Sequence, residues 1–419
     1  MKTFLIRKIV LLSAPVMVFS QSLFAQKANV LGQNLAGNVN VVTTAVPFLL
    51  ISPDARAGGM GDAGVASTPD VNSTHWNPAK LAFIPDSLKM GFAVSYAPWL
   101  RQLVPDINLS YLSFYYKLPN RQVIASSLRY FSLGNIEFTD NNGVTIGNFN
   151  PNEFAFDLSY ARQLSDNFSV GMAGRYIYSN LTGASAVQGE YTHPGQSFGV
   201  DISTYYTSKE VEVGGKKSTI AVGLCVSNLG AKISYSNSGV SNFLPTDLRL
   251  GGALNMNLDK YNKISFIVDA NKLLVPTPPV YKLDTNGSPA VGANGQPVIS
   301  AGQDPNVPIV QGMIQSFSDA PGGGVEEFHE IDWSGGMEYT YDNQFAARAG
   351  FFYESVTKGG RQYFTMGAGF RLTTLTIDAA YLIPISQQNP LQNTLRISLA
   401  FNFGKNKGNK KPDEGSSAD

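Results

Sequence analysis

Apolar and polar residues alternate with a period of two along most of the chain beyond residue 88. In the segment EFAFDLSYAR, Phe154, Phe156 and Leu158 fall on one face, while Glu153 and Asp157 fall on the other. Such alternation over about ten residues is typical of a transmembrane β-barrel strand, whose outer face meets lipid and whose inner face meets a polar lumen. The pattern predicts an all-β antiparallel barrel at residues 89–403, with about fourteen strands. They are expected at residues 89–97, 108–117, 121–132, 152–162, 168–178, 197–206, 218–228, 246–257, 262–271, 328–341, 344–354, 361–372, 374–383 and 394–403.

The connections between these strands alternate in length. The links LPN, QLSDN, LDKYN, YDN and LTT are short, whereas those after the third, fifth, seventh and ninth strands are long and rich in Gly, Asn and Pro. The longest covers residues 272–328. Outer-membrane barrels combine tight periplasmic turns with extended surface loops, so both termini are expected in the periplasm. The segment TSKEVEVGGKK is long for such a turn and is interpreted as an extended hairpin.

Charged residues of the alternating segments share the face that is expected to line the lumen. A basic side chain facing hydrocarbon costs ~2–4 kcal/mol at the bilayer centre, so this distribution fixes the register of the strands. We expect these residues to pair across the lumen or with whatever fills it. They are Asp157, Asp247, Asp269, Asp332, Glu338, Asp378, Arg249, Arg348, Arg371 and Arg396.

The first residues and the composition agree with an exported membrane protein. Three basic residues, an apolar core and the small Ala25 predict a signal peptide at residues 1–25. Only 15% of the residues are charged, with 31 basic and 31 acidic side chains, so no nucleic acid partner is expected. The single cysteine, Cys225, excludes an intramolecular disulfide. The polar segment 404–419 is expected to be a disordered periplasmic tail.

Alternation is absent at residues 26–88, which we expect to form a periplasmic segment and a plug. A barrel of fourteen strands is too wide for its own side chains to fill. Gly59, Gly61 and Gly64 have the spacing G-x-G-x-x-G of dinucleotide-binding turns, but Pro69 follows too soon for the helix that would hold a pyrophosphate. The glycines are instead expected to let an irregular segment pass closely against the barrel wall.

The string SPDARAGGMGDAGVAS, followed by HWNPAKLAF, resembles the N-terminal segment of the PorV family of the type IX secretion system. The Asn-Pro-Ala triplet ahead of a fourteen-strand barrel also resembles, more distantly, the hatch of FadL-type fatty-acid transporters. The resemblance therefore implies a FadL-like barrel with an N-terminal hatch. The plug residues that carry it are Gly58, Gly59, Gly61, Gly64, Asn77, Pro78 and Ala79.

The same resemblance implies protein transport without catalysis or a cofactor. PorV-type proteins bind the C-terminal signal domain of secreted cargo as it leaves a giant outer-membrane translocon barrel. They then deliver the cargo to a surface attachment complex with a sortase-like protease. No cargo-binding residue carries over, so the long loop, with its scattered apolar residues, is our candidate for partner binding. Its candidate contact residues are Pro276, Pro278, Val280, Tyr281, Val307, Ile309, Met313, Ile314 and Phe317.

A FadL-like channel for hydrophobic small molecules is the first alternative, because the architecture is shared. Such a channel would need a lateral opening in the barrel wall. Strand bends at Gly335 and Gly336, or at Gly367 and Gly369, would supply one, although glycine in a barrel strand is more often a simple bend.

A membrane hydrolase is the second alternative. The segment GQSFG has the spacing G-x-S-x-G around Ser197, and His193 lies nearby. A nucleophile elbow must lie between a strand and a helix, whereas Ser197 opens an alternating strand. The segment DTNGSPAVGANGQP lacks the ligand spacing of a calcium loop and is interpreted as two Asn-Gly turns, so no metal is expected.

Overall fold

The computed structural model describes residues 39–404, apart from 101–103, 105, 140–144, 182, 184–185, 188–189, 238–240 and 387–390. The predicted signal peptide, residues 26–38 of the predicted plug and residues 405–419 of the predicted tail lie outside the described residues. In the described part of the chain, no helix is long and apolar enough to cross a membrane.

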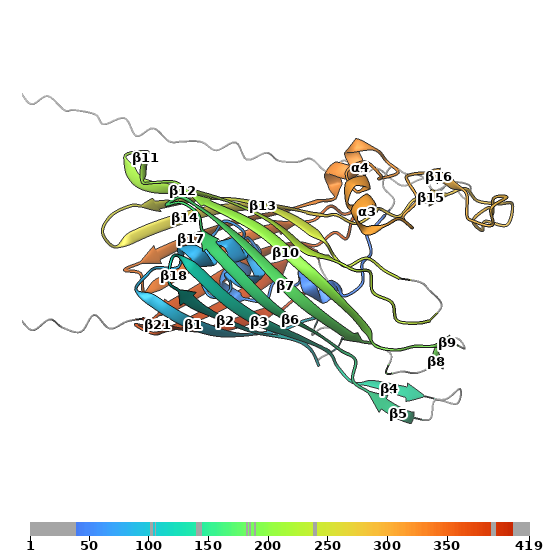
Figure 1. Ribbon diagram of the computed structural model, residues 1–419, viewed down its shortest axis with the longest axis horizontal. Coiled ribbons are helices and arrows are strands. Elements are labelled where there is room, and N and C mark those ends of the chain that lie inside the picture. The colour runs from blue at the N-terminus through green and yellow to red at the C-terminus, as the bar shows by residue number, and fades with distance from the viewer. Residues whose placement is uncertain are drawn as a thin grey trace, which may run out of the picture. The chain divides into compact units, whose positions relative to one another are not determined.

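Antiparallel strands form a closed barrel (Figure 1). Within the described residues, fourteen strands pair in chain order, and the ring closes where β1 pairs with β21. This confirms the predicted fold, with every predicted strand present and its ends displaced by three residues or fewer. The strands are β1 (Leu88–Pro98), β2 (Ile107–Leu118), β3 (Gln122–Leu133), β6 (Asn152–Gln163), β7 (Phe168–Asn180), β10 (Gly195–Thr207), β12 (Lys216–Gly230), β13 (Asp247–Asn257), β14 (Asn262–Leu273), β17 (Ile331–Tyr341), β18 (Phe345–Tyr353), β19 (Gln362–Arg371), β20 (Leu375–Pro384) and β21 (Leu395–Gly404).

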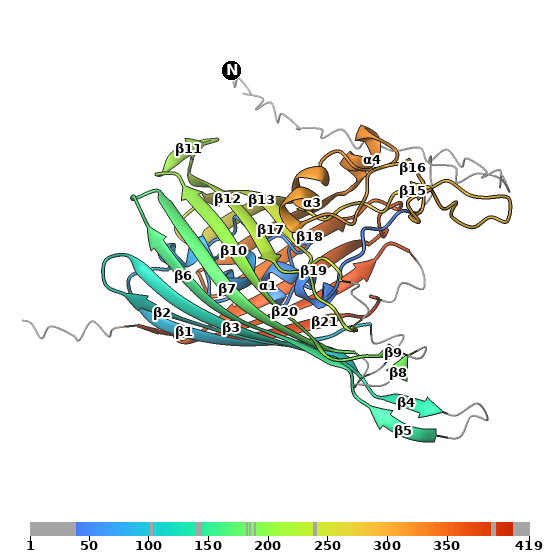
Figure 2. The same cartoon turned by 45° about the vertical axis from the view of Figure 1, so that its right-hand side comes forward.

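The two ends of the barrel differ, as the connection lengths predict. One end carries long loops and is called the loop end; the other carries short turns and is called the turn end (Figures 1 and 2). At the turn end, β11 (Val211–Val213) pairs with the start of β12, so TSKEVEVGGKK is the expected extended hairpin. The remaining short strands, all at the loop end, are β4 (Ile136–Thr139), β5 (Thr145–Phe149), β8 (Ala186–Val187), β9 (Glu190–Tyr191), β15 (Val280–Tyr281) and β16 (Ile299–Ala301).

The longest loop also contains two helices that the sequence pattern does not predict. They are α3 (Ile309–Gln315) and α4 (Gly324–His329). Both are too short for a clear helical period in the sequence, and glycine in the middle of α3 and at the start of α4 disfavours a helix. Between β15 and β16 the loop narrows to a ribbon that contains the two expected Asn-Gly turns, with isolated bridges from Leu283 to Pro289 and from Val291 to Pro297.

Burial of alternate residues confirms the predicted register. Arg249 is 4% exposed, whereas the next residue, Leu250, is 51% exposed. Asp332 is half-buried, and Arg371 is exposed near the turn end, where it lines a lumenal cavity. The other predicted lumen-facing charged residues are buried, namely Asp157, Asp247, Asp269, Glu338, Asp378, Arg249, Arg348 and Arg396.

Outward-facing aromatic residues form a girdle near the loop end. The Phe154 and Tyr178 rings stack with centroids 5.1 Å apart, and Trp333 pairs with Tyr353 across β17 and β18. Aromatic girdles of this kind mark the membrane interfaces of outer-membrane barrels. The loop-end girdle comprises Phe154, Tyr176, Tyr178, Phe198, Trp333 and Tyr353.

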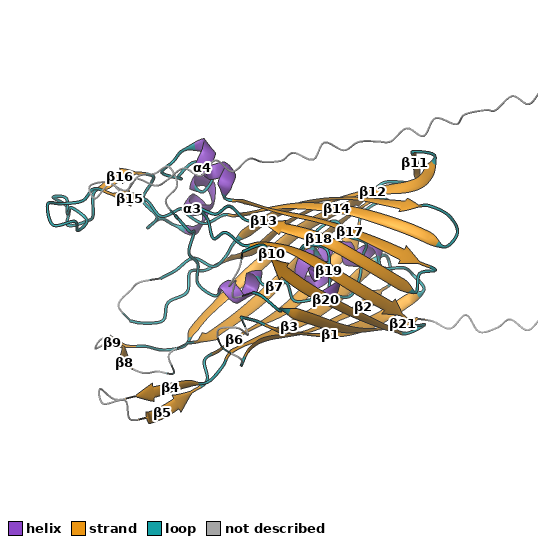
Figure 3. Ribbon diagram, turned by 180° about the vertical axis from the view of Figure 1, so that it is seen from behind, coloured by secondary structure: helices purple, strands orange, loops and turns teal. Residues whose placement is uncertain are grey.

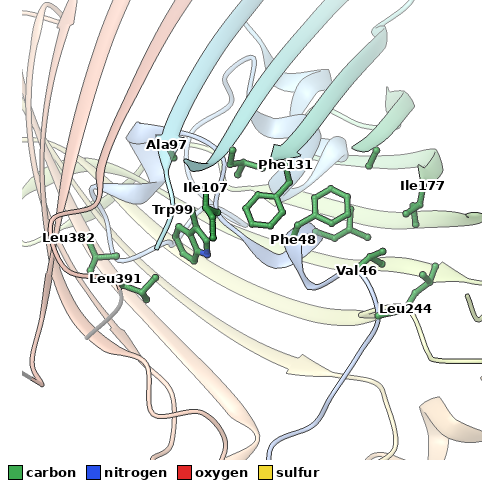
Figure 4. Close-up of a cluster of buried hydrophobic side chains, with 14 of the residues drawn as sticks. Val46, Phe48, Ala97, Trp99, Ile107, Phe131, Ile177, Leu244, Leu382 and Leu391 are labelled. Atoms are coloured by element: carbon green, nitrogen blue, oxygen red, sulfur yellow. The ribbon is translucent and has the colours of Figure 1, made fainter. Parts of the chain in front are cut away.

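Residues 39–86, here called the plug segment, lie mainly within the barrel (Figure 3). Their short helices are η1 (Pro47–Leu50), α1 (Ala55–Gly58), α2 (Ser73–Trp76) and η2 (Pro78–Phe83). Near the loop end, Val46 and Phe48 of this segment join an apolar cluster with Phe131 and Ile177 of the wall (Figure 4). The apolar core of the protein is therefore located between the plug segment and the inner wall.

Candidate functional site

Inward-facing glycines of the wall make room for the backbone of the plug segment. A Cβ atom at Gly336 of β17 would lie 2.6 Å from Met60 Cβ, and one at Gly367 of β19 would lie 3.1 Å from Gly59 Cα. Separations below 3 Å do not occur for real Cβ atoms, so alanine at Gly336 would displace the plug segment. The wall glycines that meet the plug backbone in this way are Gly171, Gly223, Gly251, Gly336, Gly350 and Gly367.

The glycines of the G-x-G-x-x-G spacing also serve close packing. Gly61 has a φ of +69°, and its amide donates a hydrogen bond of 2.8 Å to Thr365 Oγ1 of β19. A side chain there would collide with the backbone of Phe351, since its Cβ would lie 2.5 Å from the carbonyl oxygen. Gly59 faces Gly367, and Gly58 faces the side chain of Arg396.

The third glycine of this spacing, Gly64, holds the chain against β14. The amides of Gly64 and Val65 donate hydrogen bonds of 2.7 and 2.9 Å to Asp269 Oδ2. The Trp76 ring fills the space where a Gly64 side chain would be. The Asp269 carboxylate of the wall therefore already accepts hydrogen bonds from the amides that would bind a phosphate. In addition, no helix begins between Gly64 and α2. The motif binds the wall and not a pyrophosphate.

The Asn-Pro-Ala triplet attaches the plug segment to β7 and β10. Asn77 Oδ1 accepts a hydrogen bond of 3.0 Å from Ala79 N, while its Nδ2 donates one of 2.9 Å to Thr204 O. Pro78 starts η2, where its missing amide proton is not needed. Ala79 O accepts from Ser169 Oγ at 2.7 Å. Three consecutive residues thus fix the end of the plug segment on two strands.

Ion pairs connect α1 to the opposite wall. Arg56 Nη2 lies 2.8 Å from Glu338 Oε1, and Arg56 Nη1 lies 2.8 Å from Asp70 Oδ2. Arg348 Nε lies 2.6 Å from Glu338 Oε2, and its Nη1 lies 2.7 Å from Asp378 Oδ1. The network alternates in sign, so each of its buried charges has an opposite neighbour.

Two buried ionisable groups stabilise the inside of the plug segment. Lys80 is fully buried and donates hydrogen bonds of 2.6 Å to Gly64 O and 2.9 Å to Ser67 Oγ. Burial lowers the pKa of Lys80 to about 8. Asp54 caps α1 and accepts a hydrogen bond of 2.6 Å from Trp76 Nε1, and burial raises its pKa to about 6. Both groups form hydrogen bonds to other residues of the plug segment, so these contacts fix the internal structure of the segment.

In the described part of the chain, residues of the plug segment line a lumenal cavity near each end of the barrel. The cavity at the loop end, of about 420 Å³, is lined by Asp62 and Trp76 of the plug segment together with wall residues. The cavity at the turn end, of about 290 Å³, is lined by Arg56 and Thr68 together with wall residues. The plug segment therefore separates a loop-end compartment from a turn-end compartment.

A cluster of salt bridges attaches the long loop to the rim of the barrel. Glu330 Oε2 lies 2.7 Å from Lys272 Nζ, and Glu330 Oε1 lies 2.9 Å from Lys358 Nζ. Lys358 also binds Glu326 at 2.6 Å, and Thr277 Oγ1 donates to Glu330 Oε1 at 2.7 Å. By the alternation of β14, Lys272 is at an outward-facing position, whereas Lys358 lines the loop-end cavity. Glu330 thus connects the outer and inner sides of the rim.

Two carboxyl groups of the loop have shifted pKa values in opposite directions. Asp319 is buried and accepts from Thr277 N at 3.1 Å; burial, with the nearby Glu327, raises its pKa to about 6. Burial also acts to raise the pKa of Glu326, but hydrogen bonds from Lys358 and Asn40 lower it overall. Folding of the loop therefore increases the proton affinity of Asp319 and decreases that of Glu326.

The candidate contact residues of the loop do not form one surface. Pro276 is buried beneath α3, Ile314 is 70% exposed and Phe317 is 53% exposed. Three further exposed apolar residues, Val310, Val325 and Phe328, are absent from the residues predicted from the sequence. The helical spacing from Val310 to Ile314 and Phe317 would have indicated Val310, and the i, i+3 spacing would have indicated Val325 and Phe328. The half-buried candidates are Pro278, Val280, Tyr281, Val307, Ile309 and Met313.

The wall glycines considered for a lateral opening have another role. Strands β17, β18 and β19 pair without a shift of register, so the ladder is continuous at Gly335, Gly336, Gly367 and Gly369. Gly336 and Gly367 contact the plug backbone, and Gly335 faces open space. Gly369 faces the side chains of Asp378 and Arg348. Gly336 and Gly367 therefore accommodate the plug segment, and none of the four glycines interrupts the pairing of the strands.

Ser197 is located in a strand, and its environment differs from that of a nucleophile. β10 continues to Thr207, so no helix follows Ser197. Its hydroxyl donates a hydrogen bond of 2.6 Å to Ala231 O, and His193 Nδ1 lies 3.1 Å from Pro194 O. The hydroxyl therefore stabilises the start of β10.

Comparisons with known proteins give one family and several solved structures. The model of the family "Type IX secretion system protein PorV" matches residues 34–280. The chain has no match among curated proteins. Similar solved structures include the Ralstonia pickettii toluene transporter TbuX (11% identity, 84% of this chain and 98% of that one, TM-score 0.46). A Pseudomonas aeruginosa FadL homologue is also similar (12% identity, 87% and 99%, TM-score 0.44).

The family match covers more than half of the chain, including the whole plug segment and the strands from β1 to β14. The residues that carry the resemblance in the plug segment, from Gly58 to Ala79, all lie within it. The chain belongs to the PorV family of the type IX secretion system, a family of outer-membrane β-barrel proteins.

Proposed function

We propose that this protein is the component of a type IX secretion system that binds the C-terminal signal domain of secreted cargo at the translocon. It then delivers the cargo to a surface attachment complex that contains a sortase-like protease. The observation that carries this proposal is the family match over residues 34–280. Outer-membrane barrels keep their short turns in the periplasm, so we orient the loop end towards the outside of the cell and both termini towards the periplasm.

The filled lumen supports a role as a carrier of partners. The plug segment is attached to the wall on several sides, by Glu338, Asp269 and Thr204 among others. A protein that binds partners at its surface needs a stable wall and not a passage through it. We therefore assign partner binding to the loop end, above all to the loop between β14 and β17.

The long loop has features that suit partner binding. It is attached to the rim through Glu330 yet extends beyond it as the β15–β16 ribbon, whose residues are mostly exposed. Its prolines restrict the unbound loop, which lowers the entropy cost of ordering it on a partner. We assign Pro278, Val280 and Tyr281 at the base of this ribbon to the contact with the translocon or the signal domain.

A pull-down in mild detergent from native cells tests this proposal. We expect the wild-type protein to co-purify a giant barrel and secreted proteins that share a C-terminal domain. Replacing residues 277–325 with a Gly-Ser linker should keep the barrel folded and abolish this co-purification. Replacing only residues 283–297, the tip of the ribbon beyond the assigned contact residues, is the control for loop shortening and should preserve the co-purification. Normal secretion by the 277–325 variant at normal surface abundance would rule out the loop as the partner-binding site. A wild-type protein that captures neither partner would refute the proposed function.

A further inference from the structure

We call the exposed apolar residues of α3 and α4, together with Phe317 just after α3, the α3–α4 face; Lys272 links its two parts, because it contacts both the Phe317 ring and Glu327 of α4. Val310 and Ile314 are 66% and 70% exposed and are one helical turn apart, and Phe317 follows at 53%. Val325 and Phe328 of α4 are 71% and 60% exposed. On the opposite side of α3, Gly312 packs against Phe243 and Pro276. The helices therefore bury one side against the loop and leave an apolar side uncovered.

The α3–α4 face lies beside the outer side of the barrel wall. The Phe328 ring lies 6.4 Å from that of Trp333, an outward-facing residue of the loop-end girdle. Lys272, at an outward-facing position of β14, lies 5.9 Å from the centroid of the Phe317 ring and binds Glu327 at 3.1 Å. Figures 1 and 2 both show α3 and α4 outside the ring of strands near the loop end. The two helices thus cover the rim from the outside.

This position makes the α3–α4 face continuous with the lipid-contacting band. Trp333 belongs to the girdle, where indole and phenol rings lie at the boundary between hydrocarbon and head groups. A short helix with an apolar side and a charged side at this depth lies in the interface plane. α4 has such a charged side, because Glu326 and Glu327, with Glu330 just after the helix, are directed to Lys272 and Lys358, whereas α3 has no charged residue.

We propose that the α3–α4 face inserts into the lipid leaflet at the loop end and anchors the long loop to the membrane beside β14 and β17. The occupant is lipid, because the face joins a lipid-contacting surface through the contact between Phe328 and Trp333. This goes beyond the proposed secretion function, which concerns protein partners. It also assigns Ile314 and Phe317 to the membrane and leaves the base of the β15–β16 ribbon, with Pro278, Val280 and Tyr281, as the part of the loop that faces partners.

Spin labels on single introduced cysteines test the proposal in phospholipid nanodiscs without any partner protein. The labelled variants are Ile314→Cys and Val325→Cys, and the wild-type protein is the unlabelled blank because Cys225 is fully buried. Gln311→Cys is the matched polar control on α3, and Val291→Cys, 67% exposed on the ribbon, is the apolar control. We expect collisions with oxygen to exceed those with a water-soluble nickel chelate at 314 and 325, and the reverse at 311 and 291.

Other outcomes identify other occupants and overturn the proposal. Nickel accessibility at 314 equal to that at 311 would place the face in water. Protection of 314 only after secretion partners are added would make it a protein-docking surface. Spin–spin broadening that appears only with two copies per nanodisc would show that the α3–α4 face contacts a second copy of this chain. Heat-modifiable migration of each labelled variant shows that the barrel is folded.

Discussion

Arg56 of the plug segment and Glu338 of the wall form a bidentate pair inside the barrel, with Nε 3.1 Å from Oε2 and Nη2 2.8 Å from Oε1. The same carboxylate accepts from Arg348 of β18. Two guanidinium groups from different parts of the chain therefore depend on one carboxylate. The pair joins residues separated by 282 positions in sequence.

Loss of this carboxylate should strongly destabilise the protein. Glu338→Ala removes the carboxylate between the Arg56 and Arg348 guanidinium groups, which then keep only Asp70 and Asp378 as partners; breaking a buried pair typically costs ~3–5 kcal/mol. We expect a decrease of that size in the free energy of unfolding, measured by urea titration in detergent. Met337→Ala changes the neighbouring outward-facing residue and serves as control. Equal midpoints for the two variants would contradict the role of Glu338.

Adjacent glycines in β17 should respond differently to the same substitution. Gly336→Ala places a methyl group against Met60, whereas Gly335→Ala places one in open space. We expect Gly336→Ala to displace the plug segment and raise ion conductance in planar bilayers, as deletion of residues 26–87 should do. Gly335→Ala should conduct as little as the wild type. If neither Gly336→Ala nor the deletion conducts, the lumen is not sealed by this segment.

The strand register predicts an asymmetric effect of charge on β13. Leu250→Arg places a charge in the lipid and should cost ~2–4 kcal/mol if the residue lies near the midplane. Asn257→Arg, at the exposed turn end of the same strand, should assemble normally. Heat-modifiable migration after refolding into vesicles measures the yield of folded barrel for both variants. Equal yields would refute the assignment of Leu250 to the lipid face.

Protonation of Asp319 should stabilise the long loop. Its pKa is raised from 3.8 to about 6 in the folded loop, so the proton stabilises the fold fully below pH 3.8, and this stabilisation is lost as the pH rises through 6. Limited proteolysis of the loop should accordingly become faster over this range. Asp319→Asn stays uncharged and should be more resistant than the wild type above pH 6. Asp284→Asn, at an exposed position in the same loop, should behave as the wild type; a loop whose proteolysis does not depend on pH would contradict the role of Asp319.

Local pattern was sufficient to predict the barrel. The contrast between Arg249 and Leu250 is visible in sequence because alternation is a property of adjacent residues. The contact of Gly336 with Met60 is not visible, because it depends on how an irregular segment folds against a wall 276 positions away. The same holds for the contacts of Glu330, because its partner Lys272 lies near the end of β14 and its partner Lys358 lies in the loop between β18 and β19.

The helices of the long loop were also not predictable from the sequence. α3 and α4 have seven and six residues, fewer than isolated helices need, and packing on Phe243 and Pro276 stabilises α3. The candidate list for the loop therefore included buried Pro276 and omitted exposed Phe328. Apolar residues alone do not indicate which side of a loop is covered.

The fit between the six wall glycines and the plug backbone has an evolutionary consequence. A larger residue at any of these positions is acceptable only if the facing part of the plug segment retreats, and a retreat would disrupt contacts such as those of Asp269 with Gly64 and Val65. Among homologues, substitutions at these wall positions should therefore covary with substitutions at the facing positions of the plug segment. Exchanging the plug segments of two divergent homologues should fail more often than exchanging their ribbons between β15 and β16, which touch little of the wall.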